Sequence, residues 1–176
     1  MIHKVRVHPH NDLLNLAHYH RSIINGKIEV GGQDALSLDC MSCIIALSFG
    51  VEAFINFIGS NRVHNWRELQ SFRDKINKIY EAVGGSFNKN DDPYLTVWKL
   101  KELRDCIAHG QPVDNNVSVS SHEELWSEIK TPWDDCLNQE FINHAYKQVK
   151  AWQSELLEMS GISISSTITL ARGGSI

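Results

Sequence analysis

The chain has 176 residues, of which 42% are hydrophobic and 22% charged, and its formal net charge is −4. This length and composition predict one soluble globular domain with a substantial core. A negative net charge gives no overall attraction to nucleic acid, so RNA binding would need a local basic groove. The four cysteines, the polar N-terminus and the absence of a long charge-free apolar run favour a reducing cytoplasm over secretion or a membrane.

The first part of the chain predicts an extended segment over residues 1–10, ending at Pro9. An amphipathic helix is then expected from Asn11 to about Asn25, because its apolar residues recur at helical spacing. We expect Gly26 to end this helix and residues 27–33 to form a connector.

The most apolar segment runs from about Asp34 to Ser60 and is hydrophobic nearly all round, which is typical of the central helix of a bundle. Its length would suit a membrane span, but Asp39 and Glu52 favour a protein core. A carboxylate such as Glu52 must be exposed, paired or protonated in apolar surroundings. Two interpretations stay open: a solvated gap in the apolar surface, or an ion pair with Arg104.

A second amphipathic helix is predicted from His64 to Val83, with Gly84 and Gly85 at its end. Trp66 and Leu69 belong to its expected inward face. Basic residues lie on or near its polar side, namely Arg62, Arg67, Arg73, Lys75 and Lys78.

A helix is predicted between Asp92 and Gly110, because the sequence carries a capping signal at each end. Asp92 is a suitable N-cap, and Pro93 at the first helical position loses no needed N–H. Gly110 would supply a left-handed C-cap, and Pro112 forbids continuation. The expected apolar stripe comprises Val97, Leu100, Leu103, Cys106 and Ile107, widened by Trp98.

The remaining chain predicts a short irregular or β-like segment near 113–120 and a brief helix over 122–129. A last long helix is expected from Leu137 to about Met159. The tail over 161–176 alternates like a strand, and an edge strand, a dimer contact or a disordered end remain open. Together these elements predict an all-α, up-and-down bundle of four or five helices within residues 1–160.

Three side chains that could take part in catalysis are expected near the end of the 92–110 helix. His109 is expected at the last helical position, and Asp105 lies about 40° round the helix, close enough to orient an imidazole. Arg104 lies further round, off the apolar stripe. A cation, an acid and a histidine therefore gather where a helix meets a loop, a common location for chemistry.

The segment Leu103–Gly110 resembles the signature of HEPN domains, an Arg followed by a polar residue and, a few residues later, a His. Ala46–Asn56 resembles the family's central helix, which often carries a glutamate at the Glu52 position. The resemblance covers residues 34–112. It implies a helical bundle that forms a homodimer and brings two copies of the motif together. Many members are metal-independent endoribonucleases, often toxins or antiviral effectors, and others are inactive RNA-, nucleotide-binding or scaffolding modules.

The residue types suit RNA cleavage by the substrate's own 2′-hydroxyl, which needs a base, an acid and positive charge. Histidine can act as base or acid near neutral pH, and arginine can hold the phosphate. We expect His109 of both chains to act as base and acid, Arg104 to clamp the phosphate, and Asp105 to set the imidazole tautomer or bind the ribose. The residues expected to contact substrate or support the site are Glu52, Arg62, Arg67 and Arg73.

An alternative has Arg104 paired with Glu52 or Glu102 and His109 only at the helix end, in a module that binds RNA, a nucleotide or a protein. Gln111 stands where some family toxins carry a tyrosine that a partner antitoxin modifies. A modifying antitoxin is therefore not assumed, although an antitoxin protein stays a candidate partner, together with RNA and a second copy of the chain.

No metal or cofactor is expected. Cys40 and Cys43 lie in the middle of an apolar segment without a second cysteine pair, which favours buried small side chains over a zinc site. His8 and His10 are two residues apart, a spacing that diverges by about 200° in a helix and does not favour chelation.

Overall fold

The computed structural model describes residues 3–110, 129–168 and 170–173, together with the single positions 112, 114, 117, 121 and 124. In the segments 3–6 and 170–173 only the backbone is described. Gln111, most of the segment near 113–120, and the predicted helix over 122–129 except Glu124 and Ile129 lie outside the described residues.

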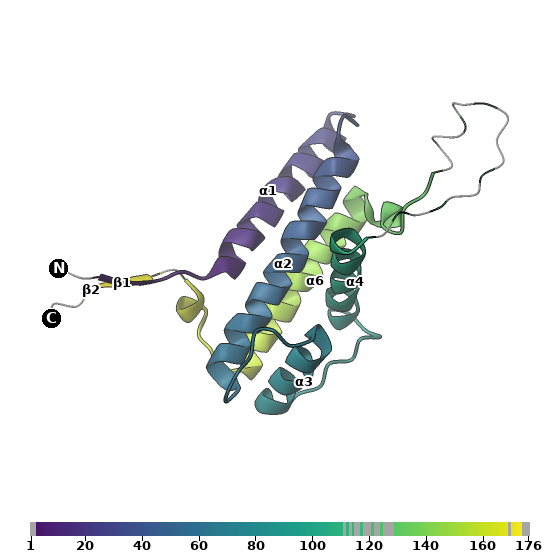
Figure 1. Ribbon diagram of the computed structural model, residues 1–176. Coiled ribbons are helices and arrows are strands. Elements are labelled where there is room, and N and C mark those ends of the chain that lie inside the picture. Colours follow the sequence, from purple (N-terminus) through teal and green to yellow (C-terminus); the bar gives the residue numbers. More distant parts are fainter. Residues whose placement is uncertain are drawn as a thin grey trace.

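Five α-helices occur in the described part of the chain, which confirms the predicted all-α bundle (Figure 1). They are α1 (Pro9–Glu29), α2 (Leu36–Arg62), α3 (Phe72–Val83), α4 (Tyr94–Ala108) and α6 (Gln139–Met159). Two 3-10 helices, η1 (Asp134–Cys136) and η2 (Ile164–Thr167), and two strands, β1 (His3–Arg6) and β2 (Leu170–Gly173), complete the described elements.

The central helix of the bundle is α2, as its apolar sequence predicted. It packs against α1, α3, α4 and α6. By length and composition alone α2 could cross a membrane. Its apolar surface is instead packed against four other helices, in the core of the bundle. Its buried residues include Cys40, Cys43, Ile44, Leu47, Val51, Phe54, Ile55 and Ile58.

The first helix is longer at both ends than the sequence predicted. Pro9 lies at the start of α1 and not in a strand, because the first turn of a helix has no use for its missing N–H. Gly26 lies inside α1, where its missing side chain leaves open space, and the helix continues to Glu29. The predicted end at Gly26 is therefore wrong.

The predicted helix from His64 is wrong over residues 64–71, because α3 begins only at Phe72. The Ser71 hydroxyl accepts a hydrogen bond from the Asp74 N–H (3.1 Å) and so caps the helix. Trp66 packs on Gly59, whose Cβ would lie 2.4 Å from the indole, and Leu69 is fully exposed. The end of α3 is as predicted, since Gly84 adopts a left-handed conformation with φ 74°.

The two ends of the described chain pair with each other. Strands β1 and β2 are antiparallel, with His3 opposite Gly173 and Arg6 opposite Leu170, and they extend away from one end of the bundle (Figure 1). Of the alternatives left open for the tail, a strand is present at β2, whereas residues 164–167 form η2. The Asn11 side chain donates a hydrogen bond to the Thr167 carbonyl, which ties η2 to the start of α1.

Candidate functional site

The helix that carries the motif, α4, begins close to its predicted cap. The Asp92 carboxylate accepts hydrogen bonds from the Thr96 N–H (3.1 Å) and hydroxyl (2.6 Å), while Pro93 takes the N-cap position. The buried face consists of Thr96, Val97, Leu100 and Leu103.

Two residues that were predicted for this apolar stripe lie elsewhere. Cys106 is exposed, because six residues after Leu100 a side chain points about 120° away from it. Trp98 is half-buried and packs against the core, as expected, but it does so toward α3, about 160° away from Leu100.

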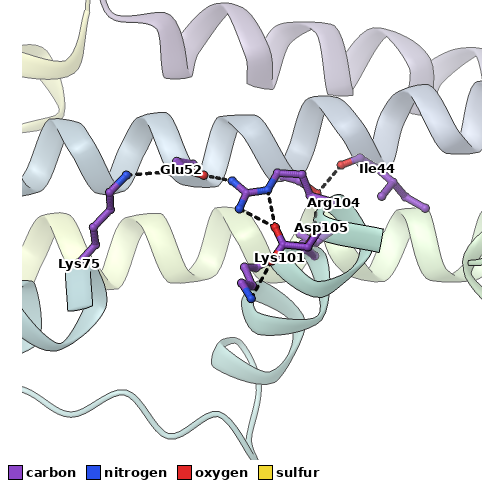
Figure 2. A network of polar contacts seen from close by, with 8 residues as sticks. Ile44, Glu52, Lys75, Lys101, Arg104 and Asp105 are labelled. Carbon is purple, nitrogen blue, oxygen red and sulfur yellow. Dashed lines mark hydrogen bonds and ion pairs between the residues drawn. The ribbon is translucent and has the colours of Figure 1, made fainter. Parts of the chain in front are cut away.

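Arg104 lies at the centre of a charged network that joins α2, α3 and α4 (Figure 2). Its guanidinium forms an ion pair with Glu52 of α2 and donates from Nε (3.1 Å) and Nη2 (2.7 Å) to Asp105 Oδ1. The other Glu52 oxygen accepts a hydrogen bond from Lys75 Nζ of α3 (2.7 Å). Lys101 Nζ lies 2.8 Å from the other Asp105 oxygen. Cations and carboxylates thus alternate along the network, which we call the α2–α4 charge network.

The network is partly withdrawn from solvent. Lys75 is only 1% exposed, and its burial lowers the pKa of its ammonium group. The side chains of Arg104 and Glu52 are 18% and 25% exposed. Of the two interpretations of Glu52, the ion pair with Arg104 is therefore confirmed, and Lys75 is a second partner that the sequence did not indicate.

Asp105 faces Arg104 and Lys101, and the structure does not place it against His109. Burial alone would raise the pKa of the Asp105 carboxyl, but the hydrogen bonds from Lys101 and Arg104 outweigh it and the pKa is lowered. Asp105 therefore holds the Arg104 guanidinium, and its expected roles of setting the imidazole tautomer or binding the ribose stay predictions.

His109 follows the last residue of α4, and its N–H donates to the Asp105 carbonyl (2.9 Å). Its side chain is exposed, and within the described part of the chain no hydrogen bond or ion pair joins the imidazole to another residue. Gly110 does not adopt the predicted left-handed conformation. A glycine is nevertheless needed there, because a Cβ would lie 2.6 Å from the Cys106 carbonyl oxygen.

The other basic residues predicted for the site lie apart from the network. Arg62 Nε donates to the Ser160 carbonyl and so links the ends of α2 and α6. Arg67 is exposed in the segment between α2 and α3. Arg73 of α3 lies over the ring of Trp98, 6.0 Å from its centroid.

Sequence reasoning missed two members of this region. Lys75 was assigned to the polar side of its helix, and Trp98 to the core. The spacing of Trp98, Lys101 and Asp105, three and four residues apart, is the available signal, since it places them on one helix face opposite Leu100.

Neither the paired cysteines nor the paired histidines form a recognisable metal site. Cys40 and Cys43 are buried, as expected, and burial raises the pKa of their thiols to about 11 and about 12. The rings of His8 and His10 lie 5.6 Å apart and do not diverge, because His8 precedes the helix. Among the described residues no three His, Cys, Asp or Glu side chains are grouped to hold a metal ion.

The lowered pKa of Asp105 gives a prediction for acid conditions. A carboxyl whose pKa is lowered by folding stabilises the protein above its ordinary pKa, and this contribution is lost as the pH falls through the folded value. Asp105→Asn should therefore decrease the free energy of unfolding at about pH 7 and much less at about pH 3. Urea unfolding at both pH values measures this, with the exposed Asp135→Asn as control. An Asp105→Asn effect of equal size at both pH values would contradict the prediction.

No family model matches the chain, and no match was found among curated proteins or solved structures. The resemblance to HEPN domains therefore depends on the sequence motifs alone.

Proposed function

We propose that the protein is a metal-independent endoribonuclease of HEPN type, with its site at the C-terminal end of α4. The observation that carries the proposal is that one helix end combines a fixed guanidinium, that of Arg104, with an exposed imidazole, that of His109. These are the two groups that cleavage by an internal 2′-hydroxyl requires.

Arg104 keeps donors for a substrate although it is paired. A guanidinium has five N–H donors. One on Nη1 is directed to Glu52, and the Nε donor and one on Nη2 are directed to Asp105. One donor on each terminal nitrogen remains for phosphate oxygens. Because Glu52 and Asp105 hold the group in place, it needs little reorganisation when the phosphorane develops.

His109 would remove the proton from the 2′-hydroxyl, whose oxygen then attacks the adjacent phosphorus. A second histidine would give a proton to the 5′-oxygen as the P–O bond to it breaks. The products are a 2′,3′-cyclic phosphate and a 5′-hydroxyl. Since one motif supplies one histidine, we propose that a two-fold homodimer supplies the pair. The setting that fits such an enzyme is the cytoplasm, in toxin–antitoxin systems or antiviral defence, with an antitoxin protein as a further partner.

A second candidate is a catalytically inactive module that binds RNA, a nucleotide or a protein. The observation in its favour is that two carboxylates face Arg104, so that the local charge is largely compensated. The overall charge of −4 also favours this candidate.

The deciding experiment incubates the purified wild-type protein with total RNA in EDTA. The chelator silences metal-dependent contaminants, and Arg104→Ala and His109→Ala purified in parallel control for metal-independent ones. Cleavage by the wild type alone, with cyclic-phosphate and 5′-hydroxyl ends, supports the nuclease. Sedimentation of the same sample measures whether it is a dimer. A folded dimer that binds RNA and leaves it intact would instead support the binding module.

A further inference from the structure

A pocket of about 300 Å³ lies between α3 and α4 on the surface of the bundle. It is lined by Arg73, Ile76, Asn77, Phe87, Lys89 and Trp98. One wall is the indole of Trp98, and cations from three different parts of the chain surround this ring. The Lys89 and Lys101 ammonium groups lie 5.6 Å from its centroid, and the Arg73 guanidinium 6.0 Å.

The Trp98 ring is held in a fixed orientation. Its Nε1–H donates to Glu102 Oε1 (2.9 Å), and Phe72 meets it edge-on at 5.9 Å between centroids. Phe87 packs against it at 6.4 Å. An aromatic side chain that does not have to be ordered on binding is a good stacking platform, because little conformational entropy is lost.

Two of the surrounding cations have no ion pair with an acidic residue in the described part of the chain. Lys101 is paired with Asp105, but no ion pair joins Arg73 or Lys89 to a carboxylate within the part of the chain that the structure describes. Their distances from the ring are near the outer limit of a cation–π contact, about 6 Å. Both cations are exposed and therefore available to an anionic ligand.

The pocket lies on the same helix face as Asp105 and His109 at the end of α4, each within about 20° of Trp98 round the helix. Arg104 lies about 120° round the helix from Trp98 and faces α2. Trp98 and Asp105 are seven residues apart, two helical turns and about 10 Å along α4. A second hollow of about 420 Å³ lies further along α4 and is lined by Lys101, Glu102, Asp105 and Cys106 among others. A flexible chain could therefore follow this face from the end of α4 to Trp98.

We propose that Arg73, Lys89 and Trp98 form a subsite for single-stranded RNA. An unpaired base stacks on the Trp98 indole, and the neighbouring phosphates are held by Arg73 and Lys89. Stacking on an aromatic wall flanked by cations is the chemistry of single-strand binding, whereas a duplex keeps its bases unavailable for stacking. An acidic peptide would use the cations but not the aromatic wall. This inference rests on the proposed function, because it extends the same site along its substrate.

The test measures fluorescence anisotropy of a labelled single-stranded RNA with protein carrying His109→Ala, so that cleavage does not interfere. Trp98→Ala should weaken binding about tenfold, the usual effect of losing one stacked base. Trp98→Phe should restore most of the affinity, and Arg73→Ala and Lys89→Ala should each weaken binding. Lys147→Ala, which removes an exposed lysine of α6, is the matched control and should have no effect.

The outcomes separate the subsite from the nuclease. If the wild-type protein cleaves no RNA but Trp98→Ala, Arg73→Ala and Lys89→Ala lose affinity, the subsite stands without the enzyme. Affinity that is unchanged in the exposed-residue variants Arg73→Ala and Lys89→Ala overturns the subsite, whatever the folding of Trp98→Ala. The absence of binding, or tighter binding of duplex RNA or of a poly-aspartate peptide, overturns it as well.

Discussion

Replacing His109 with alanine is expected to abolish RNA cleavage and to leave the melting temperature unchanged. General acid and base catalysis each contribute about 10²- to 10⁴-fold, and in a homodimer the substitution removes both groups. Stability should not change, because the exposed imidazole has no side-chain partner among the described residues. Cleavage rates on a fluorogenic oligonucleotide and a thermal melt of each protein measure the two effects.

The control for this substitution is His64→Ala, which removes another exposed histidine outside the helices. It should cleave at the wild-type rate. Arg104→Lys is a useful companion, because lysine keeps the charge but lacks the planar fork that serves two carboxylates and a phosphate together. Cleavage by His109→Ala at the wild-type rate would show that another group performs the proton transfers.

Replacing Glu52 with alanine is expected to be among the most destabilising single substitutions in the protein, at about 3 kcal/mol or more. The carboxylate is the shared partner of Lys75 and Arg104, and Lys75 is only 1% exposed. Its removal leaves a buried ammonium without its ion-pair partner, because Glu68, the other carboxylate that acts on Lys75, does not form an ion pair with it. The free energy of unfolding in urea measures the effect, with the exposed Glu81→Ala in α3 as control.

Removing the buried cation instead of the carboxylate should have a different effect on stability. Lys75→Met removes a group whose burial is unfavourable, as its lowered pKa shows, and Glu52 then still has Arg104. We expect no loss of stability, because an apolar side chain of similar size often replaces a buried ion without penalty. If Glu52→Ala and Lys75→Met destabilise the protein equally, the two cations do not share the carboxylate as described.

Much of the bundle could be predicted from local patterns. The apolar segment around Leu47 and Phe54 predicted α2, and periodicity alone predicted α6 almost to the residue. The same method failed over residues 64–71, where Trp66 and Leu69 continue a helical spacing. The Ser71 cap marks the start of α3 locally, but the packing of Trp66 on Gly59 is a tertiary contact that no local pattern contains.

The candidate site was predictable in its members but not in its connections. Arg104, Asp105 and His109 share one helix end in both sequence and structure. The pairing of carboxylates with cations depends on how α2 and α3 pack against α4. The sequence therefore left two interpretations of Glu52 open and did not indicate Lys75 as its partner. The pairing of Asp105 with Lys101, and not with His109, is a choice between neighbours at equal spacing that spacing cannot resolve.

The α2–α4 charge network and the cations around Trp98 differ in their access to dissolved ions. Mobile ions screen exposed charges beyond about 8 Å at physiological ionic strength, but they screen partly buried pairs much less. Lys75, Glu52 and Arg104 are mostly withdrawn from solvent, whereas Arg73 and Lys89 are exposed. Raising the ionic strength should therefore weaken RNA binding at the proposed subsite well before it lowers the free energy of unfolding. Release of the RNA and unfolding are then separate events.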